Sequence, residues 1–282
     1  MKTERLIYKI ILLLSIIFLF TYCNTHLVEQ YDTTPPDHPK NVVAYPGDNS
    51  VEIYWDDNTE SDVAGYNVYY SDTYWGKYEL IGNTTSNYYV DTEARNGEKY
   101  YYGVAAYDYD GNESELSYEE VYAVARPEGK NQAIFDYLKF PDNSGYDFSE
   151  YLVVPYDAND DNASADFFFE NNNGTFYLNV WEDSDIQDMG LTDSFLDIVY
   201  APLNGYVPLA EGENVKYTEA IVGHTYVIWT WDNHYAKVRI NSISNERIVF
   251  DWAYQLLEGE PQLKTNRTAL TRKPLPKKVI KK

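Results

Sequence analysis

The most constraining feature of this sequence is the alternation of apolar and polar side chains in three short runs between residues 51 and 107. In each run every second residue is aromatic, β-branched or alanine, and turn-forming residues stand on both sides. The residues that share a face are Val51, Ile53 and Trp55 in the first run, Tyr66, Val68 and Tyr70 in the second, and Tyr100, Tyr102, Val104 and Ala106 in the third. A period of two is typical of strands with one buried face. The runs therefore predict the short antiparallel strands of a β-sandwich.

The composition extends this prediction to the rest of the chain. A length of 282 residues corresponds to about two domains of ~100–200 residues each. The 30 tyrosines and 6 tryptophans favour strands, and a tyrosine ring can be buried while its hydroxyl contacts water. Signals for helices are nearly absent beyond the N-terminus. The sequence thus predicts an all-β protein.

The charge of the chain is strongly negative and unevenly distributed. The formal net charge is −23, although residues 263–282 contain eight Lys or Arg and no acid. The acidic section before them repels nucleic acid and anionic membrane surfaces, and it suits solubility outside the cell or contact with divalent cations. We therefore expect no nucleic-acid partner. The basic tail at 263–282 is expected to be disordered, where it is either simply solvated or contacts acidic lipid, polysaccharide or the acidic body.

The N-terminus has the pattern of an export signal. Three bases, Lys2, Arg5 and Lys9, precede an apolar run over residues 10–20. This run is short for a membrane span, which needs about 20 residues, and normal for a signal peptide. Residues 1–23 are therefore interpreted as a signal segment, and the body of the protein is expected to be exported.

The single cysteine of the chain, Cys23, follows this apolar run directly. Residues 19–23 resemble a bacterial lipobox, which implies that Cys23 is lipidated and becomes the mature N-terminus. Tyr22 stands where a lipobox usually has a small residue. Two alternatives to lipidation are therefore kept: an ordinary cleaved signal peptide and an uncleaved anchor. Residues 24–34 are polar and read as a tether. The prediction is a lipid-anchored protein of the bacterial cell envelope, in the outer membrane or at the cell surface, that contacts the membrane through Cys23. A lone cysteine also excludes a disulfide within the chain.

The first domain, residues 35–127, carries a specific set of motif residues. They are the prolines at 35, 36 and 39, Trp55, Tyr66, Val68, Tyr70, Gly97, Tyr100, Val104, Ala106 and the loop 110–114. Together they resemble a fibronectin type III domain. The resemblance implies a sandwich with Trp55, Tyr66 and Tyr100 in structural roles: Trp55 anchors the core, and the Tyr100 hydroxyl bonds back to the backbone. Domains of this family are mostly spacers and binding platforms, so the fold does not by itself give a function.

A second β-rich domain is expected over residues 130–262, because Pro127 ends the last strand and Gly129 loosens the link. The sequence does not define the topology of this domain. Its predicted strands are 151–156, 165–170, 175–181, 195–200, 225–231, 235–240 and 248–257. Asp232 and Asn233 predict a two-residue type I′ hairpin turn. The strand before that turn is apolar on both faces and is expected to be central in its sheet.

The hairpin over residues 224–240 resembles the C-terminal part of HmuY-like haem-binding surface lipoproteins, in which a strand, a short turn and an Ala-Lys-Val-like strand recur. The resemblance implies a domain that captures a porphyrin. Its two histidines, His224 and His234, would lie ~24 Å apart at ~3.4 Å per residue, too far to hold one iron. Haem binding is therefore disfavoured, although both histidines stay candidate ligand-binding residues.

Two tryptophans of the same hairpin, Trp229 and Trp231, share a face of the predicted strand. If exposed, an aromatic face of this kind marks a binding surface, for example for glycan. If buried, the two rings are simply core. Both residues are candidates for binding a glycan or a cell-surface protein.

Oxygen-bearing side chains alternate at Asp157, Asn159 and Asp161, as in a calcium-binding loop. The EF-hand pattern fails, because Asn162 stands where glycine is required and Phe168 stands where glutamate is required. A looser calcium site built with Asp166 is one interpretation, and a plain polar loop is the other. No other cofactor is expected.

The sequence lacks several common catalytic motifs. There is no cluster of His or Cys suited to zinc, no Gly-x-Ser-x-Gly elbow and no P-loop. The acidic loop 182–188 offers Asp183 and Asp185 as candidates for a paired acid and base. The favoured function is a non-enzymatic binding or scaffolding protein. The alternatives are a ligand-capture lipoprotein for haem or glycan, and an accessory component of polysaccharide degradation.

Overall fold

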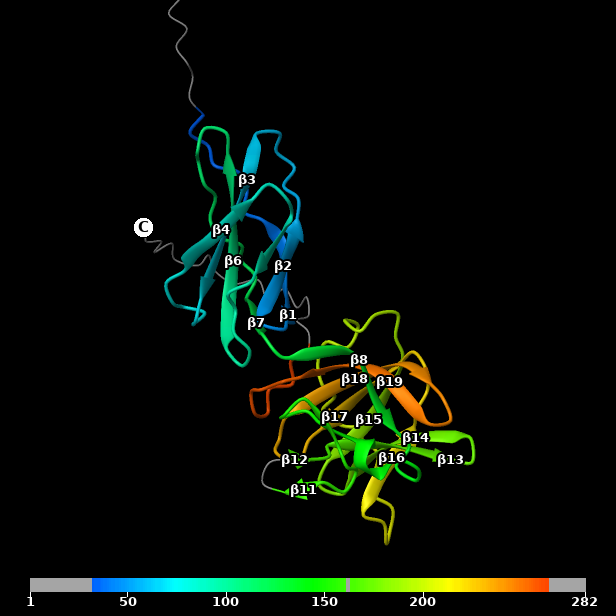
Figure 1. Ribbon diagram of the computed structural model, residues 1–282. Coiled ribbons are helices and arrows are strands. Elements are labelled where there is room, and N and C mark those ends of the chain that lie inside the picture. The colour runs from blue at the N-terminus through cyan, green and yellow to red at the C-terminus, as the bar shows by residue number, and fades with distance from the viewer. Residues whose placement is uncertain (1–31, 161–162, 264–282) are drawn as a thin grey trace, which may run out of the picture. The chain divides into compact units, whose positions relative to one another are not determined.

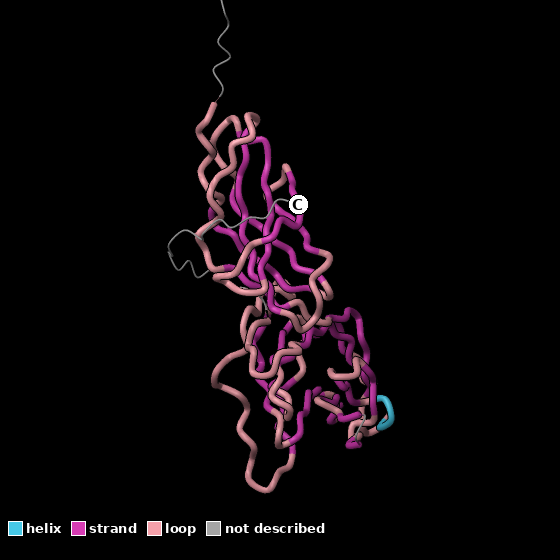
Figure 2. Tube along the Cα trace, turned by 90° about the vertical axis from the view of Figure 1, so that its left-hand side faces the viewer, coloured by secondary structure: helices cyan, strands magenta, loops and turns pink. Residues whose placement is uncertain are grey.

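The computed structural model describes residues 32–160 and 163–263. The predicted signal segment with Cys23, most of the tether, Asp161 and the basic tail from residue 264 lie outside these ranges. Within them the chain forms strands and loops, with a 3₁₀ turn at Pro141–Asn143 (Figure 2). No helix in the described part is long and apolar enough to cross a membrane. The predicted all-β fold class is confirmed.

Seven antiparallel strands build the first domain (Figure 1). They are β1 (Lys40–Gly47), β2 (Ser50–Asp56), β3 (Val63–Ser71), β4 (Glu79–Thr84), β5 (Tyr88–Asp91), β6 (Lys99–Asp108) and β7 (Val121–Val124). One sheet has the order β1-β2-β5 and the other the order β4-β3-β6-β7. This is the fibronectin type III-like sandwich predicted from the alternating runs.

The core of the first domain is formed by the inward faces of these runs. Burial alternates along β2, so that Trp55 is only 3% exposed. Tyr66 on β3 contacts it edge to face, with ring centroids 5.2 Å apart. Tyr100 on β6 lies nearer the rim, where its hydroxyl accepts a hydrogen bond from the Arg95 backbone N–H at 3.2 Å. Two sheets with one apolar face each thus bury those faces against each other.

The second domain contains the remaining strands (Figure 1). They are β8 (Glu128–Phe135), β9 (Gly145–Asp147), β10 (Leu152–Val154), β11 (Asn159–Asp160), β12 (Ala163–Ser164), β13 (Phe167–Asn172), β14 (Thr175–Trp181), β15 (Asp185–Leu191), β16 (Val215–Glu219), β17 (His224–Trp229), β18 (Tyr235–Ile243) and β19 (Arg247–Tyr254). Two five-stranded antiparallel sheets have the orders β10-β9-β13-β14-β16 and β15-β17-β18-β19-β8, and β11 pairs with β12.

Aromatic rings join these two sheets. Phe167 on β13 and Phe250 on β19 are both fully buried, with ring centroids 5.3 Å apart. Tyr146 on β9 contacts Phe250 edge to face at 5.5 Å. Because β9 and β13 belong to one sheet and β19 to the other, the three rings form the centre of the second core.

Several strands of the second domain differ from the prediction. The expected loose link at Gly129 is part of β8, which begins directly after Pro127 and pairs with β19. The acidic loop predicted at 182–188 contains the start of β15, which pairs with β17. Strands β9 and β16 were not predicted. Short or acidic segments become strands here because a neighbouring strand supplies their hydrogen-bond partners. The strand propensity of the segment itself does not reflect such pairing.

The strand predicted over residues 195–200 is also wrong, because these residues lie in the connection between β15 and β16. The fully buried Lys237 donates a hydrogen bond from Nζ to the Phe195 carbonyl oxygen at 2.7 Å. The same ammonium lies 4.2 Å from the centre of the Phe195 ring. In a strand, the Phe195 carbonyl would accept a hydrogen bond from a neighbouring strand. Here it accepts one from the Lys237 ammonium instead.

The hairpin of β17 and β18 has a longer turn than the sequence predicts. Trp229 pairs with Tyr235, and the Thr230 N–H donates to the His234 carbonyl oxygen at 2.9 Å. This leaves a three-residue loop at 231–233, with Asn233 in the left-handed region at φ 67°. A single residue with positive φ closes such a loop, whereas a type I′ turn needs two. As predicted, β17 is internal to its sheet, between β15 and β18.

Candidate functional site

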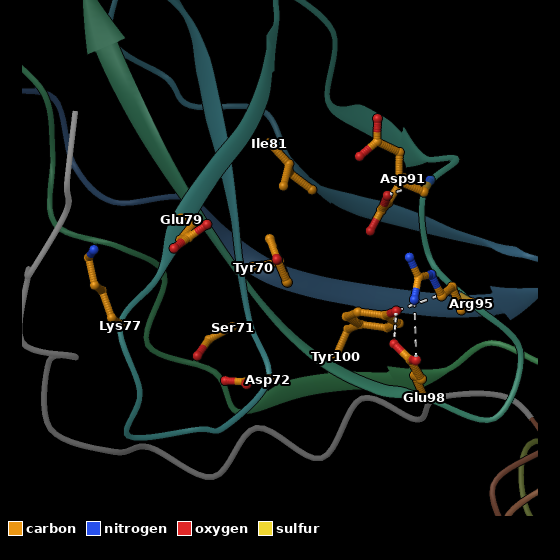
Figure 3. Close-up of a pocket in the computed structure, with 11 residues that line it drawn as sticks. Tyr70, Ser71, Asp72, Lys77, Glu79, Ile81, Asp91, Arg95, Glu98 and Tyr100 are labelled. Carbon is orange, nitrogen blue, oxygen red and sulfur yellow. Dashed lines mark hydrogen bonds and ion pairs between the residues drawn. The ribbon is translucent and has the colours of Figure 1, made fainter. Parts of the chain in front are cut away.

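A pocket of about 450 Å³ opens in the first domain beside strands β4 and β5, which are edge strands of opposite sheets (Figure 3). Its lining comes from β3, β4, β5 and β6 and from the loops that follow β3 and β5. The lining residues are Tyr70, Ser71, Asp72, Lys77, Glu79, Ile81, Asp91, Glu93, Arg95, Glu98 and Tyr100. Ligand sites in proteins fall in the range of about 300–1,000 Å³. The pocket is therefore large enough for a small organic ligand or one part of a polymer.

Two tyrosine rings and an isoleucine supply the apolar surface of the pocket. Tyr70 and Tyr100 contact each other edge to face, with centroids 5.9 Å apart, and Ile81 lies beyond them (Figure 3). The Tyr100 hydroxyl donates to Glu98 Oε2 at 2.6 Å. Burial, and then this hydrogen bond, raise the pKa of Tyr100 to about 12. The hydroxyl therefore keeps its proton at neutral pH, and the ring stays in one position.

One carboxylate in the pocket wall is held firmly. Asp91 is 7% exposed, and it accepts hydrogen bonds from the Tyr102 hydroxyl at 2.9 Å and the Glu93 N–H at 3.0 Å. Burial and the nearby Asp91 charge raise the pKa of Tyr102 far above its usual value, so this donor is permanently protonated. Asp91 thus offers its remaining acceptor capacity from a fixed place.

Four of the other charged side chains of the pocket are available to a ligand, whereas Glu98 is engaged by Tyr100 and Arg95. Asp72, Lys77, Glu79 and Glu93 make no side-chain hydrogen bond or ion pair with the rest of the described chain. Carboxylates accept hydrogen bonds and an ammonium donates them. The pocket therefore combines free acceptors, a free donor and tyrosine rings.

This combination suits a neutral molecule with many hydroxyl groups. Five carboxylates face two cations in the lining, which disfavours an anionic ligand. Within the described ranges, the pocket acids also form no group of three that approach closely enough to share one metal ion. A hydroxyl group both donates and accepts, so it can use the carboxylates and Lys77 alike.

The two histidines proposed for ligand binding are not brought together. His224 begins β17 and places Nδ1 2.9 Å from Asp188 Oδ2. His234 lies past the other end of that strand, with Nδ1 2.9 Å from the Gln255 carbonyl oxygen. The two rings thus lie at opposite ends of β17, and each has its own protein partner. They are not positioned to bind one iron together.

The two tryptophans of the hairpin do not form the expected shared aromatic face. Trp229 ends β17, stacks on Tyr235 at 5.4 Å and donates a hydrogen bond from Nε1 to Asn233 Oδ1 at 2.9 Å. Trp231 is 59% exposed in the loop. Because the strand ends at Trp229, the alternation that would align the two rings ends there too.

The predicted calcium residues are divided between the described and undescribed parts of the chain. Asp157 is exposed, Asn159 begins β11, and Asp161 lies outside the described residues. Asp166 is 6% exposed and accepts a hydrogen bond from the Phe148 N–H at 2.8 Å. Burial raises the pKa of Asp166 well above its usual range.

The carboxylates considered as an acid and base pair differ in their surroundings. Asp185 lies in β15 and forms an ion pair with Lys216 at 2.8 Å between Oδ1 and Nζ. Asp183 is exposed in the turn before that strand. Lys216 also donates a hydrogen bond to the Ser184 carbonyl oxygen at 2.7 Å. These two contacts of Lys216 give Asp185 a structural role.

Sequence reasoning did not identify the pocket, although one signal for it existed. Asp91 stands two residues after Tyr89, so alternation places this carboxylate on the inward face of β5. A charged residue at an inward position is rarely buried without a partner. That position pointed to a buried hydrogen-bond partner, which the structure identifies as the Tyr102 hydroxyl.

No model of a protein family matches this chain. Curated relatives match it in part. The amylopullulanase of Thermoanaerobacterium saccharolyticum is 44% identical over 100 residues, which cover 35% of this chain and 8% of the relative. The amylopullulanase of Thermoanaerobacterium thermosulfurigenes is 41% identical over 100 residues, which cover 35% and 5%. The chain thus spans less than a tenth of the length of these relatives.

Solved structures also match it in part. An Fn3-like protein from Clostridium thermocellum is 30% identical, covers 32% of this chain and 92% of its own, and has a TM-score of 0.28. The β-1,2-glucanase from Parabacteroides distasonis is 28% identical and covers 34% of this chain and 14% of its own, with a TM-score of 0.29.

Proposed function

We propose that this protein is a non-enzymatic accessory module of an exported polysaccharide-degrading system, and that it binds saccharide in the pocket beside β4 and β5. The observation that carries the proposal is the pocket itself, where tyrosine rings lie beside unpaired carboxylates and a lysine. Further support comes from the similarity to amylopullulanases. It extends over 100 residues, which is about the length of the fibronectin type III-like domain.

The chemistry of the pocket explains why a saccharide fits it. A pyranose has apolar faces of C–H groups and a rim of hydroxyl groups. The rings of Tyr70 and Tyr100 contact the apolar faces, as aromatic rings do in many binding sites. Asp72 and Glu93 accept hydrogen bonds from hydroxyl groups, and Lys77 donates to hydroxyl oxygens. No bond of the sugar needs to break for any of these contacts.

Calorimetric titration with maltotriose tests this site. The double variant Asp72→Asn, Lys77→Ala is expected to bind at least about tenfold more weakly than the parent, a loss of about 1.4 kcal/mol. Asp72 is exposed and Lys77 is half-buried, and neither side chain has a hydrogen-bond or ion-pair partner to lose, so the fold should be unchanged. Lys130→Ala, which removes an exposed lysine of β8, is the matched control and should bind like the parent.

The proposal fails if neither maltotriose nor any member of a neutral glycan array binds the parent protein. In that event the scaffolding role is the remaining interpretation. Turnover of a polysaccharide by the purified protein would equally contradict the non-enzymatic assignment.

The proposal includes attachment to the bacterial cell envelope through a lipid on Cys23. It is supported by the basic and apolar pattern of residues 1–20, which places the cysteine at a lipobox-like position. When the full chain is produced in a bacterium, it should incorporate a labelled fatty acid and sediment with membranes. Cys23→Ser should lose the label and appear in the soluble exported fraction. Equal sedimentation of the two proteins, with no label in either, would exclude the lipid anchor.

A further inference from the structure

Three tyrosines form an exposed surface on the outer side of the β1-β2-β5 sheet. Tyr45, Tyr54 and Tyr88 belong to one strand each, and we call them the tyrosine face. The Tyr54 ring lies 5.6 Å from that of Tyr45 and 6.0 Å from that of Tyr88, measured between centroids. Tyr54 is 37% exposed and Tyr88 is 49% exposed. Tyr45 is half-buried, so two exposed rings and one half-buried ring form a continuous aromatic surface. Neighbouring exposed rings of this kind mark a candidate binding surface.

The strand register explains why these rings share one side of the sheet. Tyr54 pairs with Tyr88 across β2 and β5, and Glu52 pairs with Tyr45 across β1 and β2. Glu52 and Tyr54 are two residues apart, so both side chains point outward, opposite the buried Ile53 between them. The arrangement follows from the same alternation that buries Trp55.

A hydrogen bond holds the central ring in place. The Tyr54 hydroxyl donates to Glu52 Oε2 at 2.8 Å. This hydrogen bond, with burial as the next cause, raises the pKa of Tyr54 to about 12. The central ring is thus fixed before any ligand arrives, which lowers the entropic cost of binding.

The tyrosine face borders the pocket along β5. Tyr88 and Val90 point outward from this strand, and Val90 is 38% exposed. The next residue, Asp91, lines the pocket, and so does Glu93 beyond it. One strand therefore connects the two surfaces, and Tyr88 of the face stands three residues before the pocket residue Asp91.

We propose that the pocket and the tyrosine face form one extended site for a single neutral polysaccharide chain. Part of the chain occupies the pocket, and the sugar units that follow cross Val90 and stack on the tyrosine rings. The occupant is neutral because Glu52, which accepts a hydrogen bond from the Tyr54 hydroxyl, carries a negative charge that repels nucleic acid and anionic lipid. This inference rests on the proposed saccharide function, and it adds that affinity increases with the length of the chain.

The test compares maltotriose with maltoheptaose by calorimetric titration of the full chain. The parent is expected to bind maltoheptaose about tenfold more tightly than maltotriose, because the additional units stack on tyrosine. Tyr88→Ala should remove this gain and leave the affinity for maltotriose unchanged. Tyr109→Ala is the matched control, since it removes a tyrosine that is 79% exposed and lies in the loop after β6, away from the face.

Two results would overturn the extended site while the proposed function stands. One is equal affinity of the parent for both sugars. The other is an equal loss for both sugars in Tyr88→Ala, which would indicate an indirect effect on the pocket. If the parent binds neither sugar nor any other neutral glycan, the proposed function and the extended site fail together.

Discussion

Replacing Trp55 by alanine is expected to lower the free energy of unfolding by about 3–5 kcal/mol. The side chain is 3% exposed and lies among the buried residues of β2 and β3, against the edge of Tyr66. Alanine would leave a cavity that two hydrogen-bonded sheets can close only in part, because their strands are held in register. A loss of this size is a large share of the stability of a typical domain.

Chemical denaturation followed by circular dichroism measures this loss, and Trp55→Phe supplies the control. The indole Nε1 of Trp55 has no hydrogen-bond partner within the described structure. Phenylalanine therefore removes an unsatisfied polar group while it keeps most of the apolar volume, and the expected loss is about 1 kcal/mol. A Trp55→Ala variant that unfolds at the midpoint of the parent would show that Trp55 is not a core residue in solution.

Replacing Phe250 by alanine is the corresponding expectation for the second domain, again with a loss of about 3–5 kcal/mol. Phe250 is fully buried and contacts Phe167 at 5.3 Å and Tyr146 at 5.5 Å, both on the opposite sheet. Edge-to-face aromatic contacts add about 0.5–1.5 kcal/mol beyond the area they bury. Truncation therefore removes apolar burial and two specific contacts between the sheets.

The neighbouring residue provides the control for this variant. Val249 points to the other side of β19 and is half-buried. Val249→Ala removes less apolar surface from water, so it should cost clearly less than Phe250→Ala in the same denaturation experiment. Equal losses in the two variants would contradict the assignment of Phe250 to the centre of the core.

The first domain illustrates how far local pattern carries a prediction. Val51, Ile53 and Trp55 alternate with polar residues, and the structure buries all three on one side of β2. Such a strand has one apolar face and one solvent-exposed face, so the alternation in its sequence predicts which side chains are buried. The second domain is harder because both faces of β17 and β18 are covered, and because β15 begins with an acid that Lys216 neutralises.

The candidate site shows the limit of the same reasoning. Trp229 and Trp231 looked like an aromatic surface because they are two residues apart, but that inference needs the strand to continue past Trp229. The pocket uses side chains that are far apart in the sequence, with Tyr70 on β3, Asp91 on β5 and Tyr100 on β6. No periodicity within one strand reports on such a group.

The sequence by itself determined the β class of this protein and which face of each strand in the first domain is buried, since a period of two is a local property of the backbone. Only the tertiary structure decided which strands meet. Packing one sheet on the other placed Asp91 within reach of the Tyr102 hydroxyl and left the pocket open beside β4 and β5. Pairing of β2 with β1 and β5 assembled the tyrosine face. These contacts join residues on different strands, so they depend on how the strands pair and pack rather than on the pattern within one strand.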